Sequence, residues 1–147
     1  IRSLQRMEEL WLQGIRALEK ALELTPERKR EEGLYQLNLN RFIVHCIRTA
    51  IHIKQWYLLK QRLFAEPDPR KAGAILDELT ALAEREIANA EAAIPLVERD
   101  SRLGWEPSMD YMADADHIRW KIEHLRSVLN SEFSSYRQSL ALTDPPA

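Results

Sequence analysis

The stretch of residues 34–64, LYQLNLNRFIVHCIRTAIHIKQWYLLKQRLF, contains neither Gly nor Pro and is the most apolar long segment of the chain. It predicts one helix, about 45 Å long at about 1.5 Å per residue. We expect so apolar a helix to be covered from at least two sides, and therefore to be the central helix of the fold. One face carries Leu34, Leu37, Val44, Ile47, Ile51 and Leu58, and Phe42, Cys46, Ile53, Tyr57 and Phe64 widen it.

Three more helices are predicted around this one. Residues 1–24 are amphipathic, with apolar side chains at three- and four-residue steps. The pair Thr25-Pro26 predicts an N-cap and a first helical residue, so the central helix runs over about residues 26–65. Asp68-Pro69 repeats this start for a third helix that ends near residue 99, with Pro95 expected to kink it or to mark a local break. Asp114 or Asp116 caps the fourth helix, whose apolar face reaches Leu140.

Short connections make consecutive helices antiparallel neighbours. The prediction is an all-α, up-down antiparallel array of four long helices around the central helix, in one domain over residues 1–147, with an ordered loop at 100–113. Residues 41–64 carry five basic side chains and no acid, whereas residues 77–100 carry seven acids and two arginines. This contrast predicts ion pairs between the second and third helices. Since the chain starts at Ile1, we expect it to be a fragment of a longer multidomain protein.

Composition excludes several classes of protein. The net charge of −2 argues against a dedicated nucleic-acid binder, which needs a sustained basic surface. No apolar run approaches the ~20 residues of a membrane-spanning helix. We therefore expect a soluble protein, cytoplasmic or secreted depending on what precedes Ile1. The single cysteine, Cys46, is expected to be a buried free thiol within the central helix.

The polar residues of the central helix form one row at steps of four and three: Arg41, His45, Arg48, His52 and Gln55. This row is either an anion-binding groove or, as we favour, a face that is solvated or ion-paired with the acidic third helix. His117 and His124 repeat the seven-residue spacing of His45 and His52, but the chain has no Glu-x-x-His motif. The carboxylate pairs Glu84 with Glu91 and Glu106 with Asp110 are expected to be surface groups. No catalytic residue, metal or cofactor is predicted.

The loop at 100–113 is the candidate site. Asp100 can cap a helix or pair with Arg102, Trp105 offers a flat face for a sugar, and Glu106, Asp110 and Tyr111 offer polar groups to a ligand. The alternative, which the residue types favour, is that Leu103, Trp105, Met109 and Tyr111 plug the end of the bundle while Asp100 and Arg102 fix the turn.

Residues 87–129 resemble the helical C-terminal region of large bacterial glycoside-hydrolase-like proteins related to α-glucuronidases and hexosaminidases. In that family a helix ending in Leu-Val-x-x-Asp leads into Ser-Arg-Leu-Gly-(Trp or Phe)-Glu. The matching positions here are Leu96, Val97, Asp100, Ser101, Arg102, Leu103, Gly104, Trp105 and Glu106. The resemblance implies an accessory or dimerising domain behind a catalytic barrel. It implies that Asp100, Arg102, Trp105 and Glu106 contact the barrel, a partner subunit or the rim of a substrate cleft.

Three functions follow from this reasoning. The leading one is a non-catalytic accessory domain of a carbohydrate-active protein, whose partner is the catalytic domain of the same polypeptide or a second subunit. The second is a stand-alone protein-binding module with an exposed apolar patch on the first or fourth helix, where Trp120 is the first candidate. The third is a small carbohydrate-binding domain that uses Trp105 and Glu106.

Overall fold

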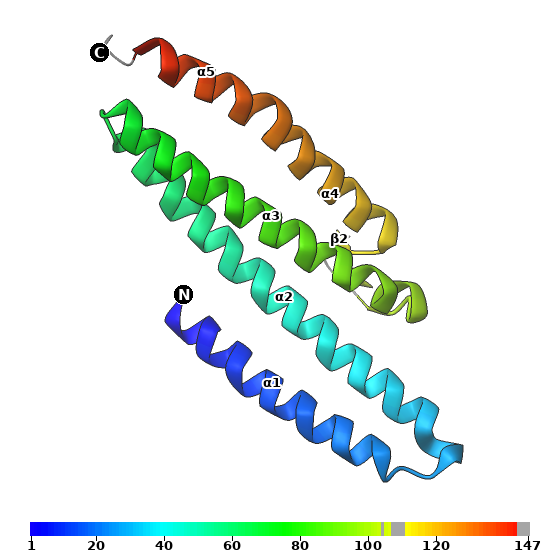
Figure 1. Ribbon diagram of the computed structural model, residues 1–147. Coiled ribbons are helices and arrows are strands. Elements are labelled where there is room, and N and C mark those ends of the chain that lie inside the picture. The colour runs from blue at the N-terminus through cyan, green and yellow to red at the C-terminus, as the bar shows by residue number, and fades with distance from the viewer. Residues whose placement is uncertain (104, 107–110, 144–147) are drawn as a thin grey trace.

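The computed structural model describes residues 1–103, 105–106 and 111–143, and confirms the all-α array (Figure 1). The helices are α1 (Arg2–Glu23), α2 (Glu27–Ala65), α3 (Pro69–Arg99) and a C-terminal rod made of α4 (Ala115–Val128), a π-helical turn η1 (Leu129–Phe133) and α5 (Ser134–Thr143). Within the segment predicted as an ordered loop, two short strands, β1 (Trp105–Glu106) and β2 (Tyr111–Met112), pair antiparallel.

The helices lie side by side, in the order α1, α2, α3 and the C-terminal rod (Figure 1). Helix α2 packs against α1 on one side and α3 on another, so the prediction that it is covered from two sides is confirmed. Helix α3 is equally central, because it packs against both α2 and the rod. Twelve residues of α3 are buried, against seven of the longer α2. Helix α1, with 22 residues, runs along only part of the 39-residue α2.

Helix starts follow the predicted chemistry at two of three places. The carboxylate of Asp68 accepts hydrogen bonds from the backbone N–H groups of Arg70 and Lys71, at 2.9 and 3.2 Å. Asp114, rather than Asp116, caps α4. The predicted Thr25 cap is wrong: Pro26 is the N-cap residue of α2, and the Thr25 hydroxyl donates instead to the carbonyl of Ala21 at 2.8 Å. The turn is so short that this hydroxyl still reaches the last turn of α1.

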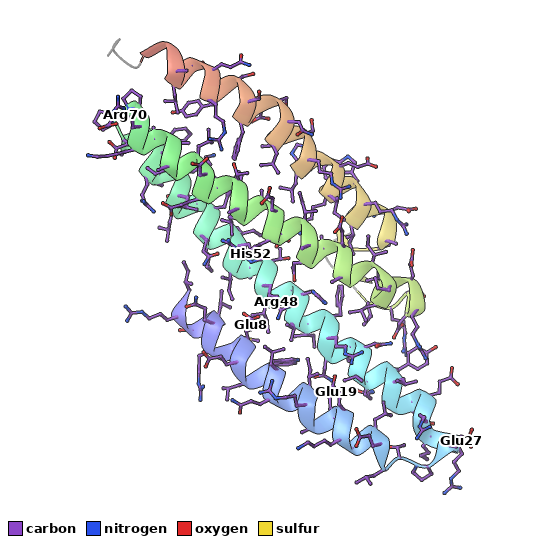
Figure 2. The ribbon with its side chains drawn as sticks, in the orientation of Figure 1. Glu8, Glu19, Glu27, Arg48, His52 and Arg70 are labelled. Carbon is purple, nitrogen blue, oxygen red and sulfur yellow. The ribbon has the colours of Figure 1, made fainter. Side chains whose placement is uncertain are left out.

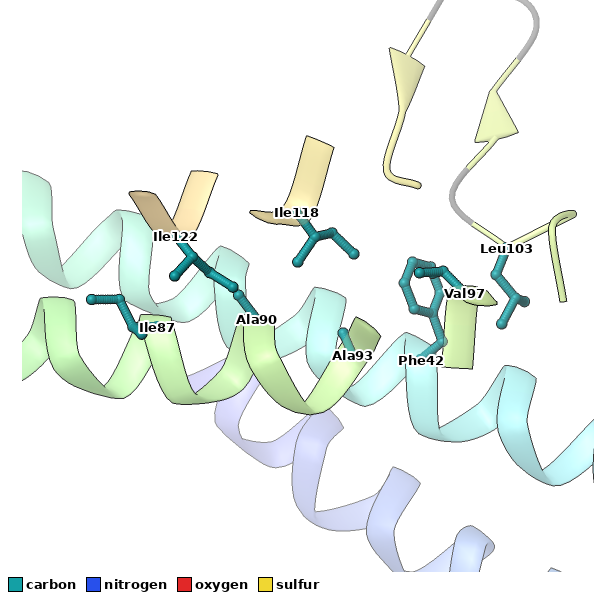
Figure 3. Packing of buried hydrophobic residues seen from close by; sticks show 8 residues of the cluster. All are labelled: Phe42, Ile87, Ala90, Ala93, Val97, Leu103, Ile118 and Ile122. Carbon is teal, nitrogen blue, oxygen red and sulfur yellow. The ribbon is translucent and has the colours of Figure 1, made fainter. Parts of the chain in front are cut away.

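Among the described residues, three apolar clusters hold most of the core. The first joins α2, α3 and α4 (Figure 3), and the small side chains of Ala90 and Ala93 in it allow the helices to approach closely. The second joins α2, α3 and the C-terminal rod around Leu76 and Leu79, which are each 1% exposed. The third lies between α1 and α2 around Ile15 and Leu37.

Two irregularities modify the helices. Helix α3 continues through Pro95 to Arg99 without a break in its assignment. In the C-terminal rod, the sequence predicts an uninterrupted α-helix, whereas the structure has the π-helical turn η1. At the end of this turn, the Phe133 ring stacks on Trp56 of α2 with centroids 5.7 Å apart and an interplanar angle of 13°. The rod therefore also contacts the second core cluster, one turn beyond Leu129, which packs against the first.

Candidate functional site

The loop proposed as the site begins with a tight ion pair. The Asp100 carboxylate accepts hydrogen bonds from the backbone N–H of Arg102 at 3.1 Å and from its Nε and Nη2 at 2.8 Å each. These bonds from the Arg102 guanidinium hold the pKa of Asp100 below its ordinary value of 3.8. The guanidinium also lies 5.5 Å from the centre of the Tyr35 ring on α2, and that of Arg99 lies 5.9 Å from it. The start of the loop is thus fixed to α2.

The rest of the loop divides into described and undescribed parts. Leu103 is 7% exposed and belongs to the first core cluster, as the plug interpretation expects for this residue. Trp105 and Glu106 lie in β1, opposite Met112 and Tyr111 of β2. Asp110 lies outside the described residues, as does Met109. The assignment of Trp105, Glu106, Asp110 and Tyr111 to a ligand site stays a prediction.

The polar row of α2 does not form one groove, because its members point to two different neighbours. The arginines bond to α1. Arg41 donates to Glu19 at 2.8 Å. Arg48 donates to Glu8 at 2.7 Å, and these two residues are labelled in Figure 2. The histidines face α3, where His45 and His52 bond to polar side chains. The ion-paired interpretation holds for this row, but α1 supplies the carboxylates for both arginines.

A buried polar network joins α2, α3 and α4, and Glu86 is its centre. The residue is only 7% exposed. Its Oε1 accepts hydrogen bonds from Thr49 Oγ1 at 2.7 Å and from Lys121 Nζ, and its Oε2 lies 2.5 Å from His52 Nδ1. Burial by itself would raise the pKa of Glu86, but the hydrogen bonds from His52, Lys121 and Thr49 outweigh burial and hold it below 4.5. Glu86 is therefore a carboxylate anion in the folded protein at neutral pH.

Asn89 extends this network by one turn of α3. Its Oδ1 lies 2.9 Å from His45 Nδ1, and its amide donates to the carbonyl of His45 at 3.1 Å and to Thr49 Oγ1 at 3.2 Å. Burial lowers the pKa of His45 below 6.5, against the opposing effect of the bond to Asn89. In the described part of the chain, no fully buried side-chain polar atom lacks a hydrogen-bond partner. Because the atoms of the network bond to one another, its chemistry is that of a structural link between helices.

Sequence reasoning missed Glu86, although a signal for it exists. The buried positions of α3 follow steps of three and four, and the apolar stripe itself contains the carboxylate: Leu79, Ala83, Glu86, Ala90, Ala93 and Val97. A charged residue within such a stripe predicts a buried partner. The partners Thr49 and Lys121 lie 37 and 35 residues away, and their helices had to be placed before they could be identified.

The acids of α3 pair mainly with the C-terminal rod, not with α2 as predicted. Three exposed pairs show this, namely Asp77 with Arg137, Glu91 with Arg126 and Glu98 with Arg119, whereas Glu78 pairs with Arg62 of α2. The prediction that α2 and α3 are neighbours is correct, but of these four exposed pairs the charge contrast anticipates only that of Glu78 with Arg62. Helix α3 lies between two basic elements, and net charge does not distinguish them.

The other histidines do not converge on a metal. His117 Nδ1 lies 2.8 Å from the Asp114 carboxylate, and His124 stacks on Trp120 with ring centroids 5.6 Å apart. Within residues 1–103, 105–106 and 111–143, no group of three or more His, Cys, Asp or Glu side chains could hold a metal ion. Among the described helices, none is long and apolar enough to cross a lipid bilayer.

Large apolar side chains of α2 are exposed. Ile53 is 64% exposed, Tyr57 61% and Phe64 70%. Cys46 is also exposed, so the prediction of a buried thiol is wrong. With Leu39, which is 38% exposed, these residues follow one another at steps of seven, seven, four and seven along α2. We name these five residues the α2 outer face: Leu39, Cys46, Ile53, Tyr57 and Phe64.

A second apolar surface lies on α1. Met7 and Leu10 are 40% and 50% exposed, and they line an open hollow of about 620 Å³ at the boundary with α2. Trp11 and Gly14 also line it. Trp120 of α4 is 66% exposed, as its position off the apolar stripe predicts. Exposed apolar groups thus occur on the first and fourth predicted helices, but the largest set belongs to the central one.

No protein-family model, curated protein or solved structure matches this chain significantly.

Proposed function

We propose that this chain is a non-catalytic helical module that binds another polypeptide through the α2 outer face. One observation carries the proposal: a helix that lies between two others leaves Ile53, Tyr57 and Phe64 more than 60% exposed in a single line. Isolated exposed apolar residues are common on protein surfaces, but a continuous line of large ones is typical of a binding surface.

The energetics agree with this role. Complete burial of one such side chain stabilises a complex by about 1.5–3 kcal/mol before the costs of association are subtracted. The residues are already held in place, since α2 is anchored by α1 and α3 on its other faces. A partner therefore meets a preformed surface and orders little of this chain on binding.

The resemblance of residues 87–129 gives the proposal a narrower form. In that form the module is an accessory domain of a carbohydrate-active protein, and it supports the catalytic domain or dimerisation. The Asp100–Arg102 pair, which is fixed against Tyr35, would then shape the loop that makes this contact. This narrower form rests on the resemblance alone.

The test of the general proposal is a titration of the 147-residue chain with helical peptides that carry a leucine stripe, followed by NMR shifts. We expect the shifts to concentrate on the α2 outer face and the Tyr57→Asp variant to abolish them. Leu24→Asp is the matched control, because Leu24 is 86% exposed but lies in the turn after α1. The proposal is wrong if no peptide binds below about 1 mM, a free energy of only about −4 kcal/mol.

A further inference from the structure

The two lysines beside the α2 outer face indicate which partner fits it. We propose that the partner is an amphipathic helix that carries carboxylates on both flanks of its apolar stripe. This inference rests on the proposed function and adds the chemistry of the partner to it.

The charged residues of this region are all basic. Residues 41–64 contain five basic residues and no acid. Three of these residues are paired within the chain, since Arg41 bonds to Glu19, Arg48 to Glu8 and Arg62 to Glu78. The remaining two, Lys54 and Lys60, are exposed, and no carboxylate of the described residues forms an ion pair with either of them.

The two lysines lie on opposite sides of the apolar line. At 3.6 residues per turn, Lys60 falls beside the line from Tyr57 to Phe64 on one flank, and Lys54 falls beside Ile53 on the other. The Lys60 ammonium is already 5.5 Å from the centre of the Phe64 ring. Their aliphatic stems extend the apolar surface while the ammonium groups stay at its edges. A helix that covers the line therefore meets one positive charge on each flank.

A second copy of this chain is the less suitable occupant. If two α2 outer faces meet, parallel or antiparallel, the flanks that approach each other carry Lys54 and Lys60 and no acid from residue 41 to residue 65. Like charges across an interface are unfavourable, and Glu or Asp on the partner's flanks removes this repulsion. The section of the face from Cys46 to Phe64 is about 27 Å long, so it fits a partner helix of about five turns.

The experiment uses the 147-residue chain and two synthetic helical peptides with the same leucine stripe, one with Glu and one with Lys on both flanks. Affinity is measured by fluorescence anisotropy, and occupancy of the face by the rate of Cys46 alkylation. We expect the Glu peptide to bind about tenfold more tightly, as two exposed ion pairs allow, and to protect Cys46. We also expect the preference to shrink at about 1 M salt, where charges are screened.

A charge reversal provides the second arm. The variant Lys54→Glu with Lys60→Glu is expected to prefer the Lys peptide. The variant Lys20→Glu with Lys71→Glu has the same net charge and changes exposed sites on other helices, so we expect it to keep the original preference. Circular dichroism of both variants verifies the fold.

Each outcome has one meaning. Equal affinity for the two peptides, or a preference for the Lys peptide, overturns the acidic partner and leaves the proposed function intact. Binding of neither peptide overturns the proposed function itself. Dimerisation of the chain at micromolar concentration in sedimentation, abolished by Tyr57→Asp, overturns the inference in favour of a second copy.

Discussion

Lys121 of α4 donates a hydrogen bond to Oε1 of Glu86, a carboxylate that is buried in α3 and is bonded at the same time to Thr49 and His52 of α2. One side chain thus links three helices that are distant in sequence. Lys121 itself bonds to α3, and the bonds of Glu86 to Thr49 and His52 connect the C-terminal rod indirectly to α2. The contribution of Glu86 can be separated from that of surface ion pairs by substitution.

The first prediction concerns the charge on Glu86. The Glu86→Gln variant keeps the size of the side chain but presents an amide to three donors, so we expect the free energy of unfolding to fall by about 2 kcal/mol. Glu91→Gln is the matched control. Glu91 of α3 also pairs with a basic residue of α4, Arg126, but its side chain is half-exposed. Its expected loss is below about 1 kcal/mol. Urea unfolding followed by circular dichroism measures both, and equal losses would contradict the buried link.

The second prediction concerns pH and His45. Because burial lowers the pKa of His45 below 6.5, the unfolded chain takes up a proton first as the pH falls. The contribution of His45 to stability is therefore complete above 6.5 and is lost as the pH falls below that value. His45→Asn keeps a donor for Asn89 and cannot titrate. In urea titrations from pH 7.5 to 5, we expect the free energy of unfolding of the wild type to fall relative to that of this variant. A difference that stays constant with pH would refute the lowered pKa of His45.

The third prediction concerns Cys46. Its side chain reaches solvent, yet partial burial raises the pKa of the thiol above its ordinary value of 9.0. We expect iodoacetamide to modify it fully without denaturant, more slowly than a cysteine in a short peptide, because less thiolate is present. The rate should rise with reagent concentration. A rate that does not depend on the reagent would show that the thiol reacts only after unfolding.

The fourth prediction compares two glycines within helices. A Cβ atom at Gly14 would meet nothing within 4 Å, so Gly14→Ala is expected to stabilise the protein by about 1 kcal/mol through helix propensity. At Gly33 the new Cβ would lie 2.7 Å from Cδ1 of Leu22, which must move aside. We therefore expect a smaller gain from Gly33→Ala. Denaturant midpoints of the two variants measure the difference, and a larger gain at Gly33 would contradict the packing between α1 and α2.

Local chemistry made most of the fold predictable. The two prolines around Asp68 end α2 and begin α3, and the spacing of Ile118 and Ile122 places the face of α4 that packs on the core. These signals lie within a few residues of the structure that they determine. The Thr25 cap does not form because the Thr25 hydroxyl donates to a competing local acceptor, the carbonyl of Ala21.

The spacing of apolar residues along one helix does not show which of them another helix covers. Phe42 and Phe64 are both apolar residues of α2, and Phe42 is 8% exposed whereas Phe64 is 70% exposed. The difference lies in the helices that surround each one, which no spacing within α2 encodes. Ion pairs show the same dependence on distance along the chain. Asp100 and Arg102 lie two residues apart, whereas Glu86 and Lys121 lie 35 residues apart. The sequence predicts the first pair, whereas the second depends on how α3 and α4 pack.

The π-helical turn η1 gives the C-terminal rod a change of phase. In an uninterrupted α-helix, an inserted residue rotates everything after it by about 100° about the helix axis, because an α-helix has 3.6 residues per turn. On the two sides of η1, Ile118 and Ile122 reach one core cluster and Phe133 and Leu140 reach another. The two ends of the rod pack against separate clusters, and η1 holds one residue more than an α-helical turn, so a one-residue deletion within η1 would restore an α-helical turn and leave both ends facing the scaffold as before.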